Sequence, residues 1–221
     1  MAAFDAKAVV RELKRELDER LAVLEAYPIE AELEEEGDLP TLLKIALKNE
    51  AEASEIAAVW MPSTPETDVK LGFARQVGDE ARHYRLIADY LRTSGVELEG
   101  FDPLAGGYSP LFQALRKLET TVERLSAGQF TREAIAMRRN DMFIAYLERH
   151  RYHDVAHIYR ESIQPDETHH HQLGVTGLEQ LLAGEDDAAR ARAAMEMTLA
   201  IADEMKKAAR QRTGAKTLPG C

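Results

Sequence analysis

Hydrophobic residues recur at intervals of three and four positions along most of the chain, which is the spacing of an amphipathic α-helix. The pattern predicts helices, in chain order, near residues 5–27, 40–61, 65–94, 109–150, 153–182 and 184–212. Ala, Leu, Glu, Lys and Arg are frequent in these stretches, and all five residue types favour helices. We therefore expect an all-α protein.

Proline, glycine and threonine mark where several of these helices begin and end. Pro28 follows the first helix. Thr64 is expected to cap the third helix, with Pro65 in its first turn. Gly95 is expected to end the third helix, and Gly128 to kink the long fourth one.

The connections between the helices predict their arrangement. Residues 95–110 are rich in Gly and Pro and long for a bundle loop, so they are expected to form a crossover or a functional loop. Two helical hairpins joined by this crossover would make an antiparallel four-helix bundle at about residues 40–182, flanked by the first and last helices. The acidic run from Glu32 to Asp38 is expected to be a solvated connector. With 221 residues, the chain is expected to form one domain, residues 1–221.

Charge and cysteine content exclude several kinds of function. The formal net charge is −11 and no cluster of Lys and Arg is typical of a phosphate-binding surface, so we expect no nucleic-acid partner. The single Cys221 excludes an internal disulfide, a four-cysteine iron site and a cysteine-ligated iron–sulfur cluster. No apolar run reaches the ~18 residues of a membrane helix, and the first residues lack the pattern of a signal peptide. We therefore expect a cytoplasmic protein without membrane contact.

The pattern Asp-Glu-x-x-His occurs twice, as DEARH and, further along the chain, as DETHH. Residues three apart share one face of a helix, so Glu80 with His83 can direct an oxygen and a nitrogen at one point. Glu167 with His170 can do the same. Both pairs lie on otherwise apolar faces, where a carboxylate is costly unless a cation or a partner compensates its charge. The two motifs therefore predict metal ligands.

A dinuclear site held by two such pairs also needs one Glu from each of two further helices. Ligands on two antiparallel helices must lie at similar distances along the helix axis from the turn that joins them. At a rise of ~1.5 Å per residue, this distance for Glu50 on the second helix is closer to that for Glu80 than the distance for Glu52 is. Glu52 lies on the more apolar face of that helix, so it stays an alternative.

On the fourth predicted helix, the candidates are Glu119, Glu123 and Glu133. The same comparison of heights favours Glu133, because the other two lie more than two helical turns too far from the turn shared with Glu167. Glu133 also lies on an apolar face of its helix.

An acidic residue about thirty positions ahead of Asp-Glu-x-Arg-His, present twice, resembles the pattern of the O₂-activating di-iron proteins of the ferritin-like superfamily. That group includes soluble bacterial multicomponent monooxygenases, acyl-carrier-protein desaturases and phenylacetyl-CoA-epoxidase-type subunits. DEARH fits the motif fully, whereas DETHH has His169 at the position of the Arg. The resemblance covers about residues 40–182 and implies a ferritin-like bundle with extra N- and C-terminal helices.

The resemblance also implies a dinuclear centre with two bridging and four further ligands. These ligands would be Glu50, Glu80, His83, Glu133, Glu167 and His170, with Glu80 and Glu167 as the bridges. Asp79 and Asp166 would accept the outer ring N–H of the ligand histidines, and Arg82 would pair with one of these aspartates. Ligand softness alone suits Fe, Mn or Zn. The resemblance favours two Fe ions, with Mn/Fe or other divalent metals as alternatives.

The function that this resemblance implies is an O₂-activating oxidase or oxygenase, acting on an unidentified small organic substrate at the dinuclear site. The chain shows no flavin, CoA or nucleotide motif, so electrons would come from an external donor. The alternative is a ferroxidase, iron-storage or iron-detoxifying protein. The amphipathic first and last helices could cover the bundle or pair two chains as a homodimer.

Several other residues have simpler interpretations. His169, His170 and His171 are consecutive, and neighbours in a helix diverge by about 100°, so at most one of them can face the site. Arg160 is expected in an ordinary salt bridge and Tyr159 in the packed core.

Overall fold

The computed structural model describes residues 4–25 and 38–213, and these two ranges contain helices and loops but no strand. The α-helices are α1 (Ala6–Glu25), α3 (Leu39–Trp60), α4 (Thr67–Thr93), α5 (Pro110–Leu115), α6 (Thr121–Leu125), α7 (Glu133–Arg149), α8 (His153–Ile158), α9 (Gln164–Leu181) and α10 (Glu185–Thr213). Shorter turns of other helix types are the 3₁₀ helix η1 (Met61–Ser63) and the π-helices η2 (Ser126–Arg132) and η3 (Tyr159–Ile163). The all-α prediction is confirmed over the described residues. Residues 26–37, with nearly all of the predicted acidic connector, lie outside them.

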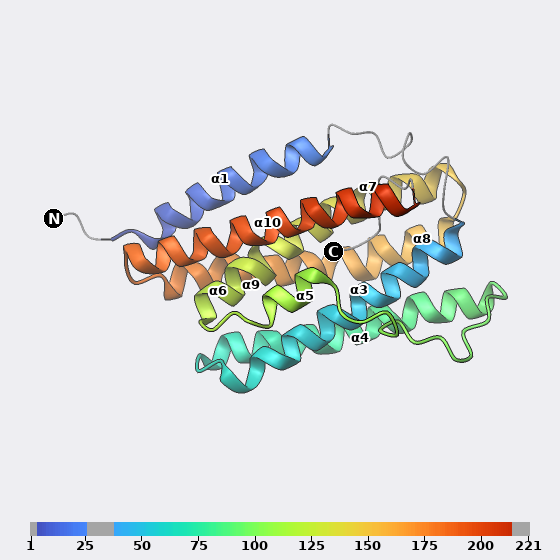
Figure 1. Ribbon diagram of the computed structural model, residues 1–221, viewed down its shortest axis with the longest axis horizontal. Coiled ribbons are helices and arrows are strands. Elements are labelled where there is room, and N and C mark those ends of the chain that lie inside the picture. Colours follow the sequence, from blue (N-terminus) through green and yellow to red (C-terminus); the bar gives the residue numbers. More distant parts are fainter. Residues whose placement is uncertain (1–3, 26–37, 214–221) are drawn as a thin grey trace.

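Two helical hairpins pack on each other, and the first of them lies along the lower side of the molecule in Figure 1. The first hairpin consists of α3 and α4, and the second consists of η2 with α7 followed by α8, η3 and α9. Residues 94–109 contain no helix and lead from α4 to α5. The short helices α5 and α6 complete the connection between the two hairpins. Helix α1 packs on α9, and α10 packs on η2 and α6, so these two helices cover the side of the second hairpin that faces away from the first (Figure 1).

Capping interactions explain several helix ends. Asp38 begins α3, because its side chain accepts a backbone N–H of the first turn at 3.1 Å. Gly95, with a φ of 81°, follows α4 and ends it as predicted. The prediction that Thr64 caps α4 is wrong. Its hydroxyl donates to the carbonyl oxygen of Trp60 at 2.8 Å, so Thr64 closes the end of α3 instead.

The prediction of one helix over residues 109–150 is also wrong in its first half. Helix α5 ends at Leu115, and a new helix begins after Thr120, where Thr120 and Glu123 form a capping box. Each of these two side chains accepts a backbone N–H of the other residue, which fixes a helix start at this point. The expected kink at Gly128 is a π-helical turn, in which a Cβ at this glycine would lie 2.9 Å from the ring of Trp60.

Two apolar clusters fill the space between the hairpins, one toward each end. The first cluster includes Ile56, Phe73, Phe130 and Leu178. The second cluster includes Leu47, Ile87, Phe143 and Ile163. Each of the segments α3, α4, η2–α7 and η3–α9 contributes to both clusters. Each segment also carries a buried ionisable residue, which is Glu50, Glu80, Glu133 or Glu167.

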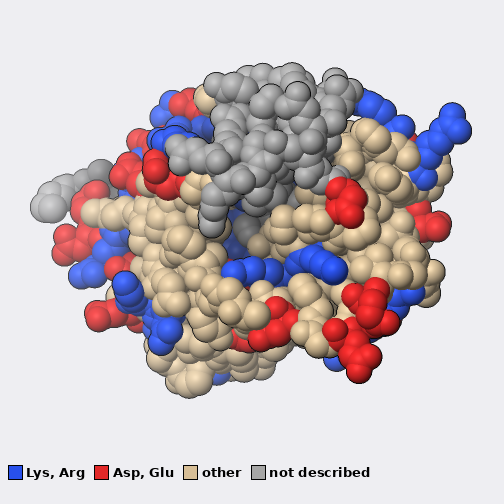
Figure 2. All heavy atoms as spheres, turned by 45° about the vertical axis from the view of Figure 1, so that its right-hand side comes forward, with Lys and Arg blue, Asp and Glu red and all other residues tan. Residues whose placement is uncertain are grey.

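The surface carries charges of both signs. On the face in Figure 2, Lys and Arg side chains lie in small groups with Asp and Glu side chains nearby. Within the described ranges, no helix is long and apolar enough to cross a membrane. The expectation that the protein binds no nucleic acid stays a prediction.

The close approach of α9 to η2 generates a prediction about stability. A Cβ at Gly174 would lie 2.5 Å from the backbone nitrogen of Phe130 and 2.8 Å from the carbonyl carbon of Gln129. Because backbone atoms cannot rotate away, Gly174→Ala should lower the free energy of unfolding by about 3 kcal/mol. Urea unfolding measures this change.

Gly78→Ala is the matched control, because a Cβ at this position in α4 meets no atom within 4 Å. Replacing a glycine inside a helix by alanine should stabilise this variant by up to about 1 kcal/mol. Equal stabilities of the two alanine variants would contradict the close packing of α9 on η2.

Candidate metal centre

Four glutamates and two histidines meet between the two apolar clusters. Helix α3 supplies Glu50, α4 supplies Glu80 and His83, α7 supplies Glu133, and α9 supplies Glu167 and His170. None of the six is more than 7% exposed. The i, i+3 spacing within α4 and within α9 places each Glu beside its His, and the packing of the two hairpins joins the pairs.

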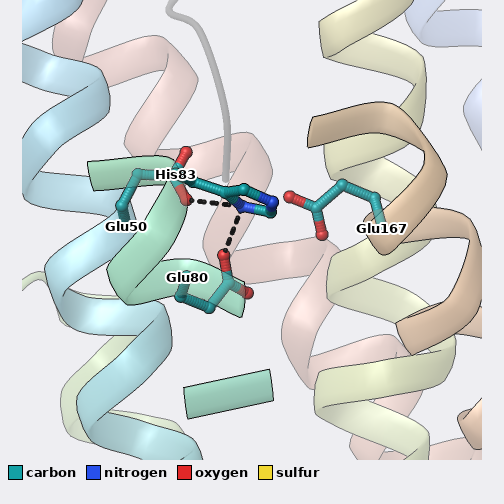
Figure 3. Close-up of side chains that lie close together, drawn as sticks. All are labelled: Glu50, Glu80, His83 and Glu167. Carbon is teal, nitrogen blue, oxygen red and sulfur yellow. Dashed lines mark hydrogen bonds and ion pairs between the residues drawn. The ribbon is translucent and has the colours of Figure 1, made fainter. Parts of the chain in front are cut away.

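These residues form two groups of candidate ligands. The first group is Glu50, Glu80, His83 and Glu167, and the second is Glu80, Glu133, Glu167 and His170. Within each group, one donor atom from each residue lies within 4.8 Å of the others. Glu80 and Glu167 belong to both groups. Figure 3 shows the first group, with dashed lines from the His83 ring to the carboxylates of Glu50 and Glu80 and the Glu167 side chain on the other side of the ring.

Both histidines direct Nδ1 at the carboxylates. In His83, Nδ1 lies 3.2 Å from an oxygen of Glu80 and 3.3 Å from an oxygen of Glu50. In His170, Nδ1 lies 3.4 Å from an oxygen of Glu167 and 3.7 Å from an oxygen of Glu80. The same nitrogen of each ring is therefore placed to bind a cation held by these carboxylates.

The outer nitrogens of the two rings contact aspartates in a crossed arrangement. Nε2 of His83 lies 3.0 Å from Asp166, and Nε2 of His170 lies 3.2 Å from Asp79. Each aspartate thus contacts the histidine of the other motif. A carboxylate that accepts the Nε2 proton fixes the ring orientation and leaves the Nδ1 lone pair available for a metal.

Two arginines compensate these aspartates from the solvent side. Arg82 forms an ion pair with Asp166, and Arg75 Nε donates to Asp79 at 3.1 Å. His169, which replaces the Arg of the second motif, contacts Arg75 at 2.9 Å. Arg75 therefore takes the place beside Asp79 that the second motif leaves without an arginine. Our sequence reasoning missed it, although its position four residues before Asp79 on one helix was a usable signal.

A second network of polar side chains holds Glu80 and Glu133 in place. Nε2 of Gln76 donates to Glu80 at 3.1 Å and to Glu133 at 2.7 Å. Gln129 donates to Gln76 at 2.7 Å, and Arg132 Nη1 donates to Glu133 at 3.0 Å. Sequence reasoning missed all three residues, although Gln76 lies one helical turn before Glu80. The other oxygen of Glu133 is buried without a hydrogen-bond partner among the described residues.

Burial and mutual contact determine the charges of these groups. Burial raises the pKa of Glu50 to about 7 and holds that of Glu167 well above its usual range, with the Glu80 charge adding to the second effect. Burial acts in the same direction on Glu80, but the hydrogen bond to His83 and nearby positive charges hold the pKa of Glu80 below its usual value. Burial alone would lower the pKa of His83, whereas its contacts with Glu50 and Glu80 raise it to about 12. Bound protons thus compensate the carboxylates when no cation does.

The donor set fits a metal. Four ionised glutamates carry four negative charges, which two divalent cations would balance. Carboxylate oxygens with imidazole nitrogens suit Fe, Mn and Zn. The buried Glu133 oxygen that lacks a hydrogen-bond partner lies in the second group, where a cation would satisfy it. The buried cluster could therefore hold a metal ion.

The alternative ligand Glu52 lies outside both groups. Its carboxylate accepts the backbone N–H of Ser109 at 2.7 Å as well as the hydroxyl of the same residue, and it lies 3.7 Å from Lys48 Nζ. Glu52 therefore secures the start of α5, and the structure brings Glu50 to the cluster instead. Glu123, a rejected candidate, belongs to the capping box of α6.

Among the three consecutive histidines, His170 alone belongs to a carboxylate group. His169 contacts Arg75, and His171 Nδ1 lies 2.9 Å from the carbonyl oxygen of Phe130. The divergence of neighbouring side chains on a helix explains these three environments.

Two residues expected to have structural roles are found in such roles. Arg160 donates to Glu148 at 2.7 Å, which is the expected salt bridge. Tyr159 is 1% exposed and packs edge-on against Phe143, with 5.0 Å between the ring centres.

A scan of the chain against protein-family models, a search of curated proteins and a search of solved structures each find no match. The chemistry of the centre therefore has to be inferred from its own residues.

Proposed function

We propose that this protein is a ferritin-like dinuclear oxidoreductase that holds two iron ions and uses O₂ to oxidise a small organic substrate. The observation that supports the proposal is that two groups of buried ligand atoms share Glu80 and Glu167. Carboxylates common to both groups can bridge two ions. Glu50 and His83 would complete one position, and the ligands of the second group the other.

Two ferrous ions held there would supply electrons for the reduction of O₂. The chain itself supplies orientation and exclusion of water. Asp79 and Asp166 hold the two imidazole rings through Nε2, and Gln76 holds Glu80 together with Glu133. The apolar clusters on both sides keep bulk water from the carboxylates. Since the sequence has no flavin or nucleotide motif, repeated turnover requires an external electron donor.

Iron loading and O₂ exposure test this function. The purified protein should bind about two irons per chain under anaerobic conditions, as the dinuclear carboxylate site of a helical bundle does. An O₂ pulse should oxidise the bound iron, and oxidation should stop there until a reductant is added. Metal analysis, an oxygen electrode and Mössbauer spectroscopy measure these steps. Continued oxidation of added Fe(II) with growth of a ferric mineral, in a large hollow assembly, would identify a ferroxidase or storage protein instead. Absence of iron binding would contradict both functions.

Matched substitutions test the ligand set. Glu50→Ala, His83→Ala and His170→Ala should each lower iron content strongly, because each removes a donor atom from the cluster. Glu52→Ala and His169→Ala are the controls, since neither side chain belongs to a ligand group, and both should retain iron near the wild-type level. Metal content per chain, measured by mass spectrometry after identical loading, distinguishes the two sets. Loss of iron in Glu52→Ala with retention in Glu50→Ala would show that the ligand on α3 is Glu52 and not Glu50.

The pKa values predict how metal affinity depends on pH. Without metal, Glu50 has a pKa of about 7 and His83 of about 12, so protons occupy groups that a metal needs in deprotonated form. Affinity for Zn(II) should therefore fall as the pH falls, by about tenfold or more per pH unit below 7. Above pH 7 the contribution of Glu50 levels off while that of His83 continues. Competition with a chelator of known pH dependence measures the slope, and a constant affinity would contradict the proposed displacement of protons.

A further inference from the structure

One side of α4 faces solvent next to the metal centre and carries three arginines. Between Asp68 and Asp89, the exposed positions of this helix recur at intervals of three and four, which places them in one row. This row, which we call the arginine face, consists of Leu71, Arg75, Gly78, Arg82 and Arg85. At a rise of ~1.5 Å per residue, the row is about 21 Å long.

Helix α9 lies beside the arginine face, since His169 contacts Arg75 and Asp166 pairs with Arg82. In this part of α9, the exposed residues are Pro165, Thr168, His169 and Gln172, none of which is acidic. The acidic residues of the same stretch, Asp166 and Glu167, are buried. Although the chain has a formal net charge of −11, arginines therefore dominate the exposed charge at this place.

Two arginines of this face cover the aspartates that hold the imidazole rings of the metal centre. Arg82 pairs with Asp166, and Arg75 lies 3.1 Å from Asp79 and 3.5 Å from Asp166. The side chains of Asp166 and Asp79 are 12% and 18% exposed, whereas the histidines that they contact are at most 1% exposed. One aspartate therefore separates each of these imidazoles from the surface.

Other sides of the charged layer are covered more deeply. Apolar clusters occupy both ends of the core, and α1 with α10 cover the side of the second hairpin that faces away from the first. A protein that delivers electrons has to bring its redox group close to the metal, because electron transfer slows steeply with distance. The arginine face offers a short approach of this kind.

We infer that the arginine face is the docking surface for an acidic protein that carries one electron at a time. Its arginines complement the charge of such a partner, and Leu71, which is 61% exposed, adds an apolar contact. Its length suits the small interfaces of electron-transfer complexes, which bury less than about 1,200 Å².

The inference rests on the proposed function for the use of these electrons, whereas binding of the partner does not depend on it. Two ferric ions need two electrons to return to the ferrous state. Two molecules of the carrier would each be oxidised by one electron to supply them.

Binding of a plant-type [2Fe–2S] ferredoxin to the full-length protein, without added iron, tests the docking surface. Arg85→Glu should weaken binding about fivefold or more at low ionic strength, because Arg85 is exposed and the new charge repels an acidic partner. Arg15→Glu on α1 is the matched control, since it changes the net charge equally on the helix across the molecule from α4 (Figure 1). It should change the affinity by less than about twofold. Calorimetry measures all three affinities.

Gly78→Trp tests the same face by shape, without a change of charge. A Cβ at Gly78 meets no atom within 4 Å, so the indole would project into solvent from the middle of the arginine face. This variant should lower ferredoxin affinity about tenfold. Ala189→Trp, at an exposed position of α10, is the matched control and should keep the wild-type affinity. Wild-type affinity in either Arg85→Glu or Gly78→Trp would overturn the inference.

Electron transfer to the iron-loaded protein tests the use of this surface. Reduced ferredoxin should reduce the ferric protein, and Arg85→Glu should lower the second-order rate constant about fivefold, as measured by stopped-flow absorbance. Reduced methyl viologen, a small carrier that needs no docking surface, should reduce both proteins at rates within about twofold of each other. Equal slowing with both reductants would indicate a change in the centre itself and would overturn the inference.

The two proposals fail in different ways. Ferredoxin binding that depends on Arg85 and Gly78, in a protein that holds no iron, would refute the oxidoreductase and leave the docking surface. Iron loading and O₂ reduction without ferredoxin binding would refute the docking surface alone. Binding of a short DNA duplex at this face in place of ferredoxin would also refute it, and would identify a nucleic-acid surface instead.

Discussion

Four glutamate carboxylates lie in the interior of a helical protein, and the electrostatic cost of placing them there constrains the residues around them. An uncompensated carboxylate in an apolar core is very unfavourable. Histidines therefore contact the carboxylates from within, and Gln76 and Arg132 donate hydrogen bonds to them. Apolar clusters occupy both ends of the core, so the charged layer is confined to its middle. The same arrangement that makes the layer tolerable without metal could hold a cation, which would replace the bound protons.

In this layer, each hairpin supplies an aspartate that contacts the histidine of the other hairpin. Asp166 of the second hairpin contacts His83 of the first, and Asp79 of the first contacts His170 of the second. Neither hairpin alone places a carboxylate on the outer nitrogen of its own histidine. The packing of α4 on α9 therefore sets both the stability of the charged layer and the orientation of the imidazoles. Arg75 compensates the charge of Asp79, because the second motif has a histidine in place of the arginine that would do so.

The π-helices lie close to the centre in the sequence. Helix η2 ends at the residue before Glu133, and η3 ends four residues before Glu167. Such widened turns are frequent at functional sites. Here η2 supplies Gln129, which donates to Gln76, and Arg132, which donates to Glu133. One irregular turn thus supplies two side chains to the polar network around Glu133.

Helical periodicity is a local property, and for that reason the sequence by itself determined the all-α class, the inward faces of α4 and α9 and the two Glu-x-x-His pairs. Glu50 and Glu52 are only two residues apart, so local spacing left both open, and the contacts of Glu52 with Ser109 and Lys48 made the distinction. The break before α6 depended on a capping box that competes with helix continuation. The crossed aspartate–histidine contacts depend on which helices meet. Only the tertiary structure decided these, because they join residues that are far apart in the chain.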